Sequence, residues 1–215
     1  MHSQICLCSL RKLKPPARPI EAPSDPYRLV SGADCRLLTF ETVNQATRLW
    51  IGGREFSIAR LLGDAYKEDV ETYTGGALAI FRLAPQHYHR FHSPVEGWIG
   101  RMTYRWRVLY CQCAFSSCGL LPNLFLISLW MQPQAIRTAL DVYGENARKI
   151  VPIHSPQFGQ VIAVCIGGMM VGSIRTTVDV GEYVQRGQEL GYFAFRMASS
   201  LPFLSILTLH WDEEC

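Results

Sequence analysis

The clearest hydrophobic pattern in the chain lies in residues 151–195. Residues 160–167 are rich in β-branched side chains and predict a strand, and residues 169–177 predict a second one. Glycines then recur at positions 181, 187 and 191 and separate short apolar stretches. Sandwiches and barrels of β-strands show this rhythm. The region therefore predicts a half-barrel or barrel-sandwich-like part of the fold.

The half of the chain that precedes this region has shorter apolar segments. They cover residues 28–30, 36–40, 47–51 and 56–62, and Gly52-Gly53 predicts a hairpin turn because glycine accepts a positive φ. Residues 56–62 fit either a strand or the start of a short helix. A further helix is predicted at residues 134–148, where apolar side chains recur with helical spacing from Ala135. The fold class expected is α+β, with a mainly antiparallel β core and a few short helices.

Composition limits the classes of function. The chain has 215 residues, of which 48% are hydrophobic and 18% charged, enough for one well-cored domain. The net charge is only +3 and the 21 basic residues are scattered, which argues against a nucleic-acid partner. Residues 1–27 are rich in proline and basic side chains and predict an arm or linker. No secretory signal core is visible there, so an intracellular protein is expected.

The cysteines do not suggest a metal site. There are eight of them, and the close pairs have C-x-C spacing, which is a poor framework for zinc. We expect no bound metal, and we expect Cys111, Cys113 and Cys118 to be reduced thiols in an irregular stretch.

Three of the six histidines, His87, His89 and His92, fall within six residues. A histidine with an ordinary pKa near ~6.5 can accept and return a proton at neutral pH, so the cluster favours acid–base chemistry. A structural alternative places His87 and His92 on the surface and His89 in a buried hydrogen bond. A metal site would need Glu96 as a further ligand and is less favoured.

The histidines lie in a segment that resembles a known signature. Leu83-Ala-Pro-x-x-Tyr-His-Arg-x-His-x-Pro-Val-x-Gly97 is similar to the histidine motif of phosphatidylserine decarboxylases. Residues 30–36 resemble the aspartate motif of that family, and residues 133–148, 158–174 and 184–193 resemble its later segments in the same order. The resemblance is to the fungal type and covers residues 11–104 and 131–195.

The resemblance implies an enzyme with a self-derived pyruvoyl group, made when a Gly–Ser bond in a Gly-Ser-Thr motif cleaves itself. The carbonyl of that group would serve as the electron sink for decarboxylation, without a bound coenzyme or metal. By the family's pattern Asp34, His92 and the serine form a relay on the logic of a serine-protease triad. His89 would position or protonate the substrate, and the reverse assignment of His89 and His92 stays open. Asp34 taken alone fits a turn residue after Gly32.

The sequence departs from the family in two places. Ala198 stands where the pyruvoyl-forming serine is expected, the nearest serine is Ser199, and Met197 replaces the preceding glycine. The small pyruvoyl-bearing subunit is therefore expected to be incomplete. We divide the chain into an arm (1–27), a catalytic domain (28–195) with an atypical insert (105–130), and an atypical tail (196–215).

Two functions follow from the resemblance. The first is decarboxylation of phosphatidylserine to phosphatidylethanolamine in phospholipid biosynthesis, and the second is a catalytically dead homologue that binds phosphatidylserine or a partner subunit. A carrier-type β domain is disfavoured because Lys149 is the last lysine of the chain. Expected partners are phosphatidylserine, a membrane surface, and a self-derived small subunit or another copy of the chain. The expected location is the periphery of a Golgi or endosomal membrane rather than the mitochondrial inner membrane.

Overall fold

The structure is a computed structural model, and it describes residues 11–14, 17–43, 57–83, 87–105, 146–167, 173–194 and 203–209. The elements in chain order are β1 (Arg36–Phe40), α3 (Ile58–Leu62), η2 (Asp64–Tyr66), α4 (Val70–Thr74), β2 (Ala77–Leu83), β3 (Arg90–His92), β4 (Gly97–Ile99), β5 (Thr103–Arg105), β6 (Arg148–Ser155), β7 (Gly159–Ile166), β8 (Ser173–Thr176), β9 (Tyr183–Val184), β10 (Glu189–Ala194) and β11 (Phe203–Leu209).

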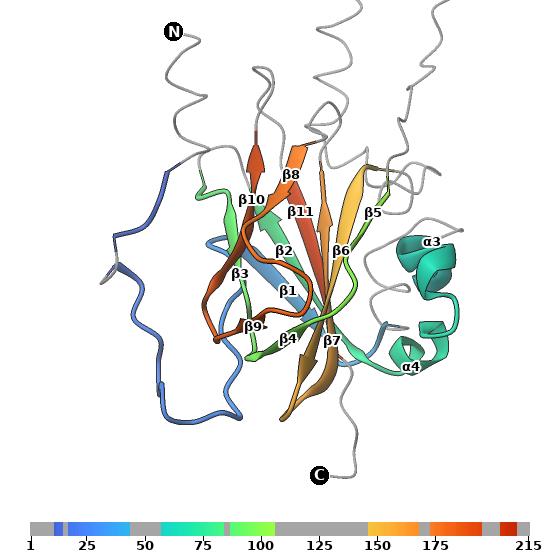
Figure 1. Cartoon of the computed structure of the whole chain (residues 1–215), viewed down its shortest axis with the longest axis horizontal. Helices are drawn as coiled ribbons and strands as arrows, with labels where there is room; N and C mark the ends of the chain where they lie inside the picture. The colour runs from blue at the N-terminus through green and yellow to red at the C-terminus, as the bar shows by residue number, and fades with distance from the viewer. Residues whose placement is uncertain are drawn as a thin grey trace, which may run out of the picture.

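These strands form two antiparallel sheets. The larger sheet has eight strands in the order β1-β2-β11-β7-β6-β4-β9, with β5 paired to β6, and the smaller has the order β3-β10-β8. Figure 1 shows α3 and α4 on one side of the larger sheet and the smaller sheet on the other. The fold is therefore α+β and dominated by antiparallel strands, as predicted, and the described strands form no closed barrel.

Two hydrophobic cores lie on the two faces of the larger sheet. In β7, Ile162 and Val164 belong to the core under the helices, whereas Val161 and Ala163 belong to the core against the smaller sheet. Successive side chains of a strand point to opposite faces, so a strand covered on both faces is apolar throughout. This two-sided burial explains the unbroken apolar run, rich in β-branched residues, that predicted β7.

A buried arginine connects the helical layer to the sheet. Arg148, at the start of β6, is 3% exposed. Its guanidinium donates to the carbonyl oxygens of Leu61 at 2.6 Å and Arg60 at 2.7 Å, both in α3. A third donation reaches the carbonyl of Asn146 at 3.2 Å. These charge-assisted bonds satisfy carbonyls that the end of the short helix leaves without helical partners.

The structure confirms some of the predicted helices and strands and corrects others. Residues 58–62 form helix α3, where Ser57 accepts a hydrogen bond from the Arg60 N–H as an N-cap. The strand predicted at 169–177 is observed as β8 from Ser173. The Gly52-Gly53 hairpin, nearly all of the 105–130 insert and most of the helix predicted at 134–148 lie outside the described residues. The predicted end of that helix is wrong, because Arg148 begins β6.

The glycine rhythm is partly misplaced. Gly181 and Gly187 have φ angles of 84° and 77° and lie in turns on either side of β9, as predicted. Gly191 instead lies inside β10, where an added Cβ would collide with the Arg175 carbonyl of β8 and the Phe91 ring of β3. A close approach between neighbouring strands, rather than a turn, requires glycine there.

The segment expected to be an atypical tail contributes a central strand. β11 pairs with β2 through Leu204↔Arg82 and with β7 through Leu204↔Ile166. The backbone of residues 203–209 therefore completes the larger sheet. This strand was not predicted, because its pairing partners β2 and β7 lie far from it in the sequence.

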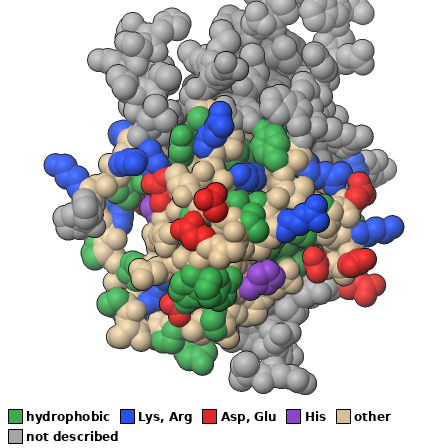
Figure 2. Space-filling model, in the orientation of Figure 1, with side chains coloured by type: hydrophobic (Ala, Val, Ile, Leu, Met, Phe, Trp, Pro, Cys, Tyr) green, Lys and Arg blue, Asp and Glu red, His purple; other side chains and the backbone are tan. Residues whose placement is uncertain are grey.

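The outer edge of the larger sheet carries exposed aromatic side chains. Trp98 of β4 is 54% exposed and packs edge-on against Tyr183 of β9 at 5.0 Å between ring centroids. Figure 2 shows hydrophobic side chains gathered over this edge. Among the described residues, no helix is both long and apolar enough to cross a membrane.

We predict that Arg148→Met lowers the free energy of unfolding by about 2–4 kcal/mol, because it leaves buried carbonyl groups of α3 without their charged donor. The measurement is denaturant unfolding followed by circular dichroism. Arg175→Met, at an exposed position on β8, is the control and should change stability by less than about 0.5 kcal/mol. Equal stability of the two variants would contradict the role assigned to Arg148.

Candidate active site

Two segments far apart in the sequence are joined at the end of β3. The backbone N–H of His92 donates to the carbonyl of Gly32 at 2.7 Å. Asp34 follows Gly32 by two residues, just ahead of β1, and His92 pairs with Glu189 across β3 and β10. The histidine and aspartate segments therefore meet through main-chain bonds.

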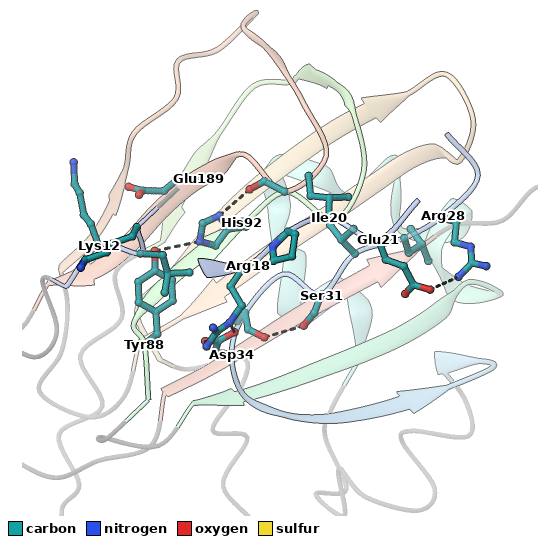
Figure 3. A pocket seen from close by; sticks show the side chains of 17 residues that line it. Lys12, Arg18, Ile20, Glu21, Arg28, Ser31, Asp34, Tyr88, His92 and Glu189 are labelled. Carbon is teal, nitrogen blue, oxygen red and sulfur yellow. Dashed lines mark hydrogen bonds and ion pairs between the residues drawn. The ribbon is translucent and has the colours of Figure 1, made fainter. Parts of the chain in front are cut away.

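Asp34 and His92 line the same cleft, which has a volume of about 520 Å³. One wall is the N-terminal arm, and the other is formed by the ends of β3 and β10 with the turn before β10 (Figure 3). The residues that line it include Lys12, Lys14, Arg18, Asp34, Tyr88, His92, Gly187 and Glu189.

The hydrogen bonds of His92 assign its neutral tautomer. Nδ1 lies 2.9 Å from the carbonyl oxygen of Gly187, and Nε2 lies 3.3 Å from the hydroxyl of Tyr88. A carbonyl oxygen can only accept, so Nδ1 carries the proton and the lone pair is on Nε2. The Tyr88 ring also stacks on the imidazole, with 5.8 Å between centroids and 23° between planes. His92 thus presents a basic Nε2 held by a tyrosine hydroxyl.

Asp34 has a different partner from the one that triad logic predicts. Its carboxylate accepts two hydrogen bonds from Arg18 of the arm, at 2.7 Å from Nη2 and 3.2 Å from Nε. The hydrogen bond and charge of Asp34 raise the pKa of Arg18 above its usual value. The position beside Nδ1 of His92, which an aspartate occupies in a serine-protease triad, is taken by the Gly187 carbonyl.

His89 lies away from this cleft. Its side chain is buried, with 1% exposed, and it does not line the cavity that contains His92. Its carbonyl accepts from the N–H of Phe193 in β10 at 3.0 Å, so it lies beside the end of β10 opposite to Glu189. His87 lines an adjoining groove with Asp34 and Tyr88. The three clustered histidines therefore occupy three different environments.

Sequence reasoning missed the residues that hold the arm in place. Arg186 is 8% exposed, and its guanidinium donates to four carbonyls, those of Ala22, Pro23, Asp25 and Arg28. Arg28 lies one residue past the predicted end of the arm, so from here on the arm denotes the described residues up to Leu29. Its neighbour Gly187 has a positive φ and lies against the side chain of Ile20. The segment interpreted as an arm or linker is thus fixed to the catalytic domain. No local pattern signals this role, because Arg186 meets the arm only in the folded chain.

The residues of this chain do not fit a self-derived pyruvoyl group. That group needs a serine at position 198, and Ala198 has no hydroxyl from which it could form. Residues 195–202, which include Met197 and Ser199, lie outside the described residues, between the end of β10 and the start of β11. Among the described residues, no three His, Cys, Asp or Glu side chains are grouped so that they could hold a metal ion.

Comparisons with known proteins agree on one family. The family model for phosphatidylserine decarboxylase matches residues 6–200. Phosphatidylserine decarboxylase proenzyme 3 of Schizosaccharomyces pombe is 43% identical over 204 residues, which cover 95% of this chain and 19% of the relative. Proenzyme 2 of Saccharomyces cerevisiae is 42% identical, with 86% and 14% covered. The proenzyme of Chlamydia muridarum is 39% identical, with 86% and 54% covered. The chain thus spans between about a seventh and about half of the length of these relatives.

We predict that neutral His92 carries its proton on Nδ1. A long-range ¹H–¹⁵N correlation spectrum, recorded above the pH at which histidine titrates, should show Nδ1 as the protonated nitrogen, with His92→Gln used to assign the signals. Tyr88→Phe should keep this tautomer, because the Gly187 carbonyl remains its acceptor. A proton on Nε2 of His92 in the unsubstituted chain would contradict the geometry.

Proposed function

This chain belongs to the phosphatidylserine decarboxylase family, and we propose that its fold carries the site for converting phosphatidylserine to phosphatidylethanolamine in phospholipid biosynthesis. The observation that carries the proposal is the meeting of the aspartate and histidine motifs, because Asp34 and His92 line one cleft although 58 positions separate them. The relatives, all named phosphatidylserine decarboxylase proenzymes, support the same reaction.

In this proposal His92 is the group that moves protons. The Tyr88 hydroxyl donates a hydrogen bond to the Nε2 lone pair. Another hydroxyl, or an acidic proton of the substrate, can replace it there. Nδ1–H keeps its hydrogen bond to the Gly187 carbonyl when Nε2 takes a proton, so the ring holds its orientation through the transfer. His89 is hydrogen-bonded through its carbonyl to Phe193, near the end of β10. We assign it the role of positioning or protonating the substrate.

Asp34 would act in this relay after it exchanges its partner. Its ion pair with Arg18 is partly solvent-exposed, with the two side chains 38% and 61% exposed. Solvent screens an exposed ion pair, so the exchange costs little. A carboxylate released from Arg18 is then available to stabilise a positive charge on His92 within the same cleft.

We further propose that the chain, with Met197-Ala198 at the cleavage position, remains an uncut proenzyme. Self-cleavage needs a hydroxyl placed against the preceding carbonyl in a tight turn. Ala198 supplies no hydroxyl, and Met197 lacks the conformational freedom of glycine. This chain would therefore form the pyruvoyl group of the family only with a serine at position 198.

Ala198 also supports a second candidate function. A homologue that cannot cleave itself could still bind phosphatidylserine or a partner subunit through the intact cleft. The two candidates differ in the outcome of restoring the motif, because a site that has kept its catalytic geometry should regain cleavage. The location at a Golgi or endosomal membrane remains a prediction under either candidate.

We predict that the unsubstituted chain runs as one species of 24.3 kDa on denaturing electrophoresis. The triple substitution M197G/A198S/S199T, which rebuilds Gly-Ser-Thr, should produce cleavage between positions 197 and 198, with a blocked N-terminus on the smaller fragment by mass spectrometry. The cleaved protein should convert phosphatidylserine to phosphatidylethanolamine in detergent micelles.

The controls isolate the hydroxyl and the base. M197G/S199T, which keeps Ala198, should stay uncut. In the triple background His92→Ala should slow cleavage by at least about 100-fold, the size expected for loss of a general base, whereas His154→Ala, on the exposed face of β6, should leave it unchanged. A triple variant that folds and stays uncut would overturn the proposal for this site, and cleavage of the unsubstituted chain would overturn its assignment as an uncut proenzyme.

A further inference from the structure

The cleft is lined by more positively than negatively charged side chains. Three carboxylates line it, and each is paired with an arginine: Asp34 with Arg18 at 2.7 Å, Glu21 with Arg28 at 3.4 Å, and Glu189 with Arg90. Two lysines, Lys12 and Lys14, also line the cleft. In the described part of the chain, neither of their ammonium groups has an ion pair or a hydrogen bond. The cleft therefore has two uncompensated positive charges on one side.

The backbone that carries these lysines is held against the body of the protein. The guanidinium Nε of Arg90 donates to the carbonyl of Arg11 at 2.9 Å, and Tyr88 has a hydrogen bond with the backbone of Leu13. Both side chains of Lys12 and Lys14 are exposed, and Figure 3 shows Lys12 at the same end of the cleft as Tyr88 and Glu189. Lys12 thus projects from a segment that is fixed on either side of it, next to His92.

The same arm presents apolar side chains to solvent. Ile20 is 37% exposed, Tyr27 67% and Leu29 42%, and both Ile20 and Leu29 line the cleft. A soluble anion would gain nothing from this apolar rim. An anionic amphiphile would contact the lysines with its charged group and the apolar rim with its apolar part.

We propose that Lys12 and Lys14 form a subsite for the phosphate group of an anionic phospholipid headgroup at the mouth of the cleft. This inference rests on the proposed function, because it places the phosphodiester of the substrate beside the cleft that contains His92. Lysine binds phosphate as a point charge, and two ammonium groups on one arm match a phosphodiester without the need for a bidentate arginine. In the structure Arg18, Arg28 and Arg90 are each paired with a carboxylate. The two lysines are therefore the cations of the cleft that can meet the ligand without breaking an ion pair.

The test is co-sedimentation of the full, unsubstituted chain with vesicles of phosphatidylserine mixed into phosphatidylcholine. K12Q/K14Q should weaken binding by about 30-fold, the effect expected for two basic residues at an anionic lipid surface. The matched control is K67Q/R101Q, which removes the same charge from exposed positions in the η2–α4 turn and the β4–β5 connection. It should weaken binding by no more than about twofold, and equal losses in the two double variants would overturn the subsite.

Two further measurements separate the sources of the phosphate. A short-chain dihexanoyl phosphatidylserine, which has both the phosphate and apolar chains, should displace the protein from the vesicles at concentrations at which inorganic phosphate does not. Equal displacement by inorganic phosphate would overturn the assignment to a lipid headgroup. Binding needs no cleavage at position 198, so it reports on the lysines even if the decarboxylase proposal fails. In the M197G/A198S/S199T background, K12Q/K14Q should leave the rate of self-cleavage unchanged, because the two lysines are assigned to lipid binding alone. A loss of self-cleavage in this variant would overturn that assignment.

Discussion

The structure depends on a sheet that is buried on both faces. The central strands β2 and β7 place alternate side chains in two different cores, so each strand needs apolar residues on both faces and cannot shift its register without exchanging the two sets. β11 lies between them and completes the layer through backbone pairing. This fixed platform sets the position of the smaller sheet β3-β10-β8, and the candidate site lies at one end of that sheet.

The site uses main-chain groups where the family analogy suggested side chains. Gly187, in a turn with positive φ, offers its carbonyl to Nδ1 of His92, and the Gly32 carbonyl accepts from the His92 backbone N–H. Carbonyls fixed by backbone geometry hold the imidazole without the cost of ordering a carboxylate side chain. Asp34 remains close by in an ion pair with Arg18 that solvent partly screens. The arrangement keeps the base oriented while the aspartate is free to change partner.

The N-terminal arm is part of the cleft because of buried arginines on the catalytic domain. Arg186 binds four carbonyls of the arm, and Arg90 binds a fifth, that of Arg11. A proline-rich segment leaves many carbonyls without hydrogen-bond partners. A guanidinium has five N–H donors and can bind several of these carbonyls at once. The same contacts place the lysines and the apolar side chains of the arm at the mouth of the cleft, where the proposed headgroup subsite lies.

By itself the sequence determined the family, the fold class, and the residues that make up the site's motifs. Order and spacing sufficed for these because the β-branched run of β7 and the signature at residues 83–97 are local patterns. It could not assign β11, the strand position of Gly191 or the start of β6 at Arg148, because each depends on a neighbour distant in the sequence. Only the tertiary structure decided that His89 and His92 lie in different environments, and that Gly187 and Arg18 are the partners of His92 and Asp34. Hydrogen-bond partners depend on distances between segments, and a linear pattern of residue types does not contain those distances.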